Sequence, residues 1–181
     1  QGLTVRLTEK DELRRRFAER LDEMKNQAGY PPLEGTTDIY SFNQAGLIAS
    51  GNIWSPRPVF QSYFAVSPEL TERNRQHLLG DDAPDNLIFR IEPIDGRYPS
   101  TEDGPSWPVI LSRYIPTELT DRHLLLKKNE SSIEDVTWTL IGQETHVLGE
   151  EIKVPDTGEP IFARIEVDSS LPGKLATLLF K

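Results

Sequence analysis

Short apolar runs alternate with helix-length amphipathic segments between residues 35 and 128, and this alternation constrains the fold more than any other feature of the chain. The strand-like runs, rich in β-branched and aromatic residues, are TDIYSF, RPVFQSY, NLIFRI and HLLLKK. The segments between them that indicate helices are NQAGLIASG, SPELTERNRQHLLG and SWPVILSRY. Strands that alternate with helices are typical of βαβ units. We therefore predict an α/β domain over residues 30–128, with a mostly parallel sheet flanked by helices.

The most clearly marked of these helices starts after Ser67. This serine can cap the first turn, Pro68 suits the first helical position, and Gly80 ends the segment.

An N-terminal amphipathic helix is predicted within residues 1–29, ahead of the α/β domain. Thr8 can serve as its N-cap, and Gly29 ends it before two prolines. Apolar residues spaced by four, four and three form one stripe along it: Leu13, Phe17, Leu21 and Met24. Such a stripe usually packs on the protein's own core, and a neighbouring upstream segment is the alternative partner.

The composition changes after Lys128. A polar connector, KNESSIED, leads into short alternating runs around the turn at Asp156-Thr157-Gly158. In IFARIEV the apolar residues occupy every second position, as in a half-buried strand of an antiparallel sheet. We predict a β-rich C-terminal subdomain of antiparallel strands over residues 129–181.

The net charge of −9 disfavours nucleic acid and anionic membranes as general partners, because both require clustered cations. Arg14, Arg15 and Arg16 are consecutive, so on a helix they point in different directions, and we interpret them as solvated. The chain has no cysteine, which excludes disulfides and thiol catalysis. Its composition is that of a soluble domain, without the roughly 18 consecutive apolar residues of a membrane span.

No catalytic or nucleotide-binding signature is present in the sequence. It lacks a P-loop, a dinucleotide-binding glycine motif, a nucleophile elbow and the HExxH motif. The three histidines are spaced in a way that suggests no metal site. We therefore predict neither a cofactor nor a metal.

Polar residues are concentrated in the two loops that follow predicted strands. In parallel α/β sheets, ligands bind outside the carboxyl ends of the strands. Asp38 and Tyr40, near the first strand, can reach the same rim. The candidate ligand-binding residues are Gln61, Ser62, Tyr63, Asn74, Asp95, Arg97, Tyr98, Glu102, Asp103 and Trp107.

A structural explanation of these loop residues competes with the functional one. Asp95-Gly96 and Asp103-Gly104 are common turn dipeptides, and Asp103 or Ser106 can cap the next helix. We expect Arg97 to pair with an acidic residue, Glu102 or Asp103, and to hold its loop against the rim at residues 61–63.

Two long stretches resemble a known family. The runs are EGTTDIYSFNQAGLIASGNIWSPRPVFQSYFAVSPELTERNRQHL and APDNLIFRIEPIDGRYPSTEDGPSWPVILSRY, with PIFARIEVDSSLPGKLATLLFK further on. They resemble the soluble part of large multi-pass bacterial membrane proteins of unknown function that are loosely related to membrane glycosyltransferases. RPVFQSY and IDGRYP are the most specific pieces. Phe64 and Val66 depart from the pattern, which has a small and an aromatic residue there.

The resemblance implies an extracytoplasmic domain, periplasmic or at the cell surface, anchored through the transmembrane region of its parent protein. It supplies no catalytic residues. The start at Gln1-Gly2 and the end in the apolar run LATLLFK also lead us to expect a piece of a longer chain.

Three functions are consistent with the sequence. The first is an accessory domain that binds a glycan or a lipid-linked sugar, with tyrosine and tryptophan rings covering the sugar. The second is a hydrolase or transferase that uses two of Asp95, Glu102 and Asp103 as acid and base, with Asp95 and Glu102 as the pair to examine, since adjacent carboxylates rarely flank one bond. The third is a structural assembly module, which an exposed apolar patch on Leu13, Phe17 and Leu21 would favour.

Overall fold

The computed structural model describes residues 6, 8–40, 42–90, 94–97, 101–129, 131, 136–170 and 173. The chain divides into two compact units, Gln1–Trp138 and Thr139–Lys181. The first unit contains the sheet and its helices, and each unit is described by itself.

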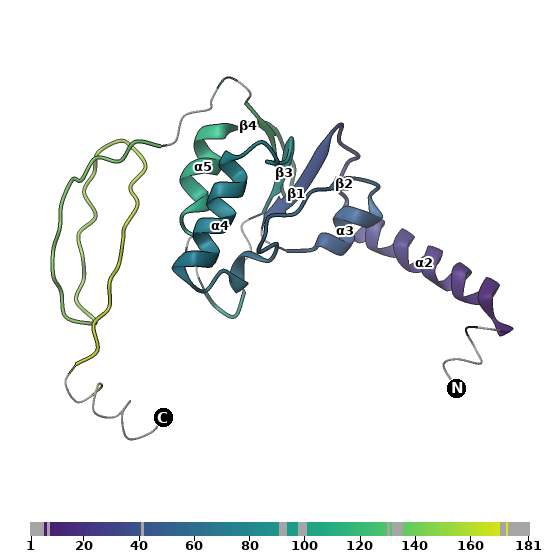
Figure 1. Cartoon of the computed structure of the whole chain (residues 1–181), viewed down its shortest axis with the longest axis horizontal. Coiled ribbons are helices and arrows are strands. Elements are labelled where there is room, and N and C mark those ends of the chain that lie inside the picture. Colours follow the sequence, from purple (N-terminus) through teal and green to yellow (C-terminus); the bar gives the residue numbers. More distant parts are fainter. Residues whose placement is uncertain are drawn as a thin grey trace. The chain divides into compact units, whose positions relative to one another are not determined.

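The first unit is an α/β fold built on a five-stranded mixed sheet, which confirms the predicted class (Figure 1). The strands are β1 (Thr36–Tyr40), β2 (Ile53–Trp54), β3 (Asn86–Phe89), β4 (Tyr114–Leu119) and β5 (Leu124–Lys128), in the order β2-β1-β3-β5-β4. β1 pairs in parallel with β2 and β3, whereas β5 pairs antiparallel with β3 and β4. The parallel part thus lies at one side of the sheet, and a β4-β5 hairpin completes the other.

Four helices and one 3-10 turn accompany the sheet: α2 (Lys10–Ala28), α3 (Gln44–Ala49), η1 (Ser62–Phe64), α4 (Pro68–Leu79) and α5 (Ser106–Arg113). α4 begins as predicted, because the Ser67 hydroxyl accepts a hydrogen bond from the amide of Leu70. α2 ends at Gly29 in the left-handed conformation, also as predicted. Its N-cap is Glu9, which makes no side-chain cap bond, so the predicted cap at Thr8 was wrong.

The predicted strand RPVFQSY is wrong. The short strand of this region, β2, lies upstream at Ile53–Trp54, and Ser62–Phe64 forms the 3-10 turn η1. Prolines at positions 56 and 58 supply no N–H for a sheet ladder. The amide of Arg57 is directed to the Asp38 carboxylate at 3.3 Å instead of to a neighbouring strand.

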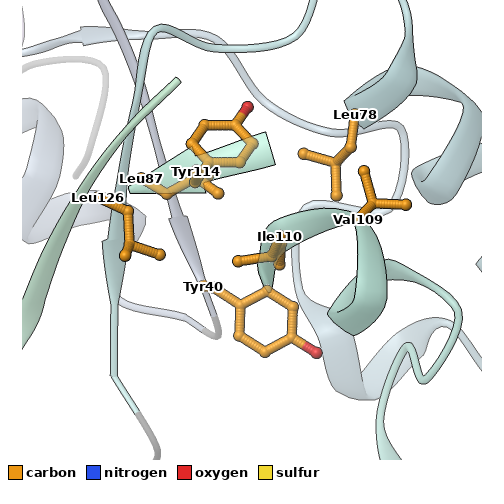
Figure 2. Close-up of a cluster of buried hydrophobic side chains, with 7 residues drawn as sticks. All are labelled: Tyr40, Leu78, Leu87, Val109, Ile110, Tyr114 and Leu126. Carbon is orange, nitrogen blue, oxygen red and sulfur yellow. The ribbon is translucent and has the colours of Figure 1, made fainter. Parts of the chain in front are cut away.

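Helices cover both faces of the sheet, and one apolar cluster lies on each face. Under α4 and α5 the cluster is Tyr40, Leu78, Leu87, Val109, Ile110, Tyr114 and Leu126 (Figure 2). On the face of α3 and the end of α2 it is Ala28, Tyr30, Ile39, Leu47, Ile88 and Leu125. Successive residues of β1, β3 and β5 alternate between the two clusters, as the pleat of a strand requires.

Residues 136–170 carry no assigned helix or strand, and they form extended lengths of chain joined by turns (Figure 1). Ile165 and Val167, which were predicted to face a core, are exposed. The predicted antiparallel pairing is therefore not seen in this part of the chain, and the described antiparallel pairs are those of β5 with β3 and β4. Among the described residues, no helix is both long enough and apolar enough to cross a membrane.

Candidate functional site

The hydroxyl of Tyr40 is the centre of a polar cluster at the carboxyl end of β1. It donates a 2.8 Å hydrogen bond to the backbone carbonyl of Glu102, which comes from the loop before α5. The rings of Phe89 and Trp107 pack against the Tyr40 ring at centroid distances of 5.2 and 5.7 Å. Burial raises the pKa of Tyr40, so the hydroxyl keeps its proton. The loop after β3 is therefore held to the end of β1 through this residue.

Arg57 lies beneath the same edge and joins three segments of the chain. Its Nε donates to Asp38 at 2.8 Å, its Nη2 to the carbonyl of Ile39 at 2.9 Å, and its Nη1 to Asp103 at 3.5 Å. The guanidinium also lies 4.7 Å from the centroid of the Tyr40 ring. The side chains of Arg57, Asp38 and Asp103 have no solvent exposure. A single buried cation thus pairs with two carboxylates from different elements.

Asn74 of α4 completes this network. Its Nδ2 donates to the Asp103 carboxylate at 2.9 Å and to the carbonyl of Val59 at 3.0 Å, and its Oδ1 accepts from the amide of Val59 at 2.8 Å. The side chain therefore ties the segment after β2 to the loop before α5.

Asp103 and Glu102 are adjacent buried carboxyl groups with raised pKa values. Burial raises the pKa of Asp103 to about 6, against the opposing effect of Arg57 and Asn74. Burial also raises the pKa of Glu102, whose residue is only 4% exposed. Asp103 adopts a positive φ of 51°, a conformation that Asp and Asn tolerate better than most residues. This turn conformation directs two successive carboxyl groups into the interior.

Five buried polar atoms at this edge have no hydrogen-bond partner among the described residues: Ser62 Oγ, Glu102 Oε1, Asp103 Oδ1, Ser106 Oγ and Trp107 Nε1. Ser62 and Trp107 lie beside the Tyr40 hydroxyl, and Ser106 lies beside the Asp103 carboxylate. Buried polar groups in folded proteins almost always have a partner, which is ordered water where no protein group serves. The hydroxyls and the indole N–H thus lie close to Tyr40 and Asp103 without meeting full hydrogen-bond geometry, so the edge carries donors and acceptors that are incompletely satisfied.

Aromatic side chains adjoin this edge on the outside. The rings of Tyr63 and Phe64 lie 4.7 Å apart, Phe64 is largely exposed, and Tyr63 is half-buried. Gln61, also partly exposed, precedes them in the same turn. The turn thus presents apolar rings immediately beside the buried hydroxyl of Ser62.

The structure brings together five of the residues proposed from the sequence: Ser62, Asn74, Glu102, Asp103 and Trp107. Gln61 and Tyr63 lie on the adjoining turn. Tyr98 lies outside the described residues.

Arg97 pairs with an acidic residue as expected, but its partner is Asp95 at 3.6 Å within the same loop. Their side chains are 45% and 80% exposed, so this pair does not fasten the loop to the rim. Arg57, rather than Arg97, links the loop before α5 to the end of β1, through Asp103 and Asp38. The sequence analysis did not identify this residue. The available signal was a cation between two prolines.

The arrangement suits hydrogen bonding better than acid–base catalysis. Among the described residues, Asp103 is engaged by Arg57, and Asp95 pairs with Arg97 on an exposed turn, where its charge adds to the effect of burial in raising the pKa of Glu102. The described residues also contain no group of three or more His, Asp or Glu side chains placed to hold a metal ion. Comparison with protein-family models, with curated proteins and with solved structures gave no match.

Proposed function

We propose that the α/β unit is a non-catalytic binding module for a polyhydroxylated ligand, a glycan or the sugar of a lipid-linked glycan. The observation that carries the proposal is the group of buried polar atoms around Tyr40 and Asp103 whose hydrogen bonds are incomplete among the described residues. Sugars present many hydroxyls that both donate and accept, so they match a mixed set of carboxyl, hydroxyl and indole N–H groups.

The aromatic turn supports the same ligand class. A sugar ring has an apolar face, and the exposed Phe64 with its neighbour Tyr63 offers a surface for it beside Ser62. Glu102, protonated more readily than an ordinary glutamate because of its burial, can donate to a ligand oxygen or accept from a ligand hydroxyl. A neutral ligand is favoured because the cation of the site, Arg57, is already occupied by Asp38 and Asp103.

We also propose that the chain is an accessory domain of a bacterial membrane protein, located outside the cytoplasm. The resemblance of residues 34–128 to the soluble part of such proteins supports this location. Two reporter fusions to the natural full-length protein, each made at the position of this domain, test the location. A reporter enzyme that works only outside the cytoplasm should be active, and one that works only in the cytoplasm should be inactive.

Glycan binding is tested by titration calorimetry of the chain against a panel of bacterial cell-envelope oligosaccharides. We expect saturable binding that is weakened by Glu102→Gln, which exchanges the carboxyl group for an amide of the same shape, and by Trp107→Phe, which removes the indole N–H. Asp81→Asn is the matched control, because this exposed carboxylate precedes β3, at the end of that strand away from the site. Absence of binding across the panel, or equal affinity in Glu102→Gln and the wild type, would exclude the proposed site.

A further inference from the structure

Helix α2 carries an uneven charge distribution that has no role in the proposed glycan site. At 3.6 residues per turn, successive side chains are rotated by about 100° around the helix axis. Leu13, Phe17, Leu21 and Met24 then form one stripe, and Ala28 continues it to the contact with α3. The basic and acidic residues of the helix lie on different sides relative to this stripe.

Every charged residue of α2 within about 100° of the stripe's centre is basic. These residues are Lys10, Arg14, Arg16, Arg20 and Lys25. The opposite side holds all the acidic residues of the helix, together with one arginine: Asp11, Glu12, Arg15, Glu19, Asp22 and Glu23. The apolar stripe is therefore bordered by cations on both sides, and the acidic charges lie at the back.

This face is open to solvent along most of its length. Phe17 is 65% exposed and Met24 40% exposed, while Ala28 is the one buried residue of α2. Figure 1 shows α2 extending away from the sheet, with α3 beside its C-terminal end. Arg14, Arg16 and Arg20 form ion pairs with acidic residues three or four positions away, and these pairs are highly exposed. Exposed pairs of this kind exchange partners at little cost.

We propose that this face of α2 binds the surface of an anionic lipid bilayer, with the helix lying in the plane of the interface. Phe17 and the leucines would enter the boundary between headgroups and acyl chains, and the bordering cations would reach the lipid phosphates. Long arginine and lysine side chains suit this position because their apolar stems lie in the boundary while their charges stay in water. The back of the helix, which is acidic, faces away from the membrane.

The charge pattern decides between a membrane and a second copy of the chain. Two copies of this face would bring cations onto cations along both borders, which opposes self-association. The five cations extend from residue 10 to residue 25, about 22 Å at 1.5 Å per residue. Arg14 and Lys25 lie on one side of the stripe, Arg16 and Arg20 lie on the other, and Lys10 lies at its N-terminal end, a spread of cations that matches a plane of anions. The net charge of −9 for the whole chain comes from residues outside α2, because basic residues outnumber acidic ones within the helix.

Co-sedimentation of the whole chain with vesicles tests the proposal. We expect binding to vesicles of equal parts phosphatidylglycerol and phosphatidylcholine, and much weaker binding to pure phosphatidylcholine. Phe17→Glu should weaken the binding at least about tenfold, since it removes a large apolar group from the interface. Asn26→Glu is the matched control, because it adds the same acid on the opposite side of the helix and should change binding little.

A second variant tests the electrostatic part with the stripe intact. Arg14→Gln combined with Arg20→Gln should weaken binding to the anionic vesicles by more than about tenfold at low salt, at roughly fivefold for each cation near the surface. Binding that is equal on both vesicle types, or equal losses in Phe17→Glu and Asn26→Glu, would overturn the proposal. So would a concentration-dependent dimer that Phe17→Glu abolishes. Glycan binding should persist in Phe17→Glu, so the two proposals can fail separately.

Discussion

The guanidinium of Arg57 and the carboxylate of Asp38 form a 2.8 Å ion pair from which solvent is completely excluded. Both oxygens of Asp38 are used, because Trp54 Nε1 donates to the second at 3.2 Å. The remaining Arg57 donors reach Ile39 and Asp103. The pair thus joins β1 to the segments on either side of α4.

Replacement of Arg57 should destabilise the fold strongly. Arg57→Ala leaves two buried carboxylates without their cation, and breaking a buried ion pair from one side typically costs about 3–5 kcal/mol. Arg57→Lys keeps the charge but loses most of the directed hydrogen bonds, so it should fall between alanine and the wild type. Urea unfolding monitored by tryptophan fluorescence measures these differences.

Arg97→Ala is the control for this prediction. Its pair with Asp95 is exposed, so the substitution should cost no more than about 1 kcal/mol. Equal losses for the two arginines would show that the buried network does not hold the loop.

Stability should also depend on the protonation of Asp103. Burial raises the pKa of this carboxyl group in the folded protein to about 6, above its ordinary value of 3.8. The folded state therefore binds the proton more tightly than the unfolded state. The resulting stabilisation is fully present below about pH 4 and is lost as the pH rises through 6, with a total of about 3 kcal/mol at most.

Asp103→Asn isolates this contribution, because asparagine tolerates the same positive φ and does not titrate in this range. The difference in unfolding free energy between wild type and variant should change in favour of the wild type as the pH falls from 7 to 4. A difference that is constant over this range would mean that Asp103 has an ordinary pKa.

Local signals in the sequence predicted the helices of the fold well. Ser67, Pro68 and Gly80 mark the ends of α4 through capping interactions that involve only neighbouring residues. β4 was missed because five of its six residues are exposed, so the strand has no apolar alternation, and Pro116 disguises it further. The strand predicted at residues 57–63 was wrong because the true strand, β2, ends at Trp54. The apolar residues after it follow two prolines, which cannot donate to a sheet.

Part of the candidate site was also predictable from local sequence signals. Ser62, Glu102 and Asp103 were found because polar residues after strands gather at one edge of a sheet. Arg57 was not found, because its partners Asp38 and Asp103 lie 19 and 46 positions away along the chain. Nothing near residue 57 indicates which carboxylates it will meet, so only the tertiary structure identifies this network.

Two buried tyrosine hydroxyls allow a structural role to be separated from a role in the site. Tyr40 donates to the carbonyl of Glu102 at 2.8 Å, and Tyr114 donates to the carbonyl of Pro84 at 2.9 Å. Both belong to the same apolar cluster (Figure 2). Tyr40→Phe and Tyr114→Phe should each cost about 1–3 kcal/mol, since each leaves a carbonyl without its donor.

Only Tyr40→Phe should also alter glycan binding, because Tyr40 positions Glu102 and lies beside Ser62 and Trp107. Calorimetric titration of both variants under conditions where they are folded makes the comparison. If Tyr114→Phe impairs binding as much as Tyr40→Phe, the effect is one of general stability and Tyr40 has no special place in the site.

The contact between α2 and α3 depends on Gly46. A methyl group added at this position would lie 2.7 Å from Cβ of Ala28, a distance far too short for two carbon atoms. Gly46→Ala must therefore shift α2 relative to α3, and overpacking of this kind typically costs about 1–3 kcal/mol. We expect a lower urea midpoint and faster amide exchange over residues 21–30, with little change near Arg57. Gly142→Ala is the control, because no atom lies within 4 Å of the added methyl. If exchange in residues 21–30 is the same in Gly46→Ala as in the wild type, α2 is not held to the sheet through this contact.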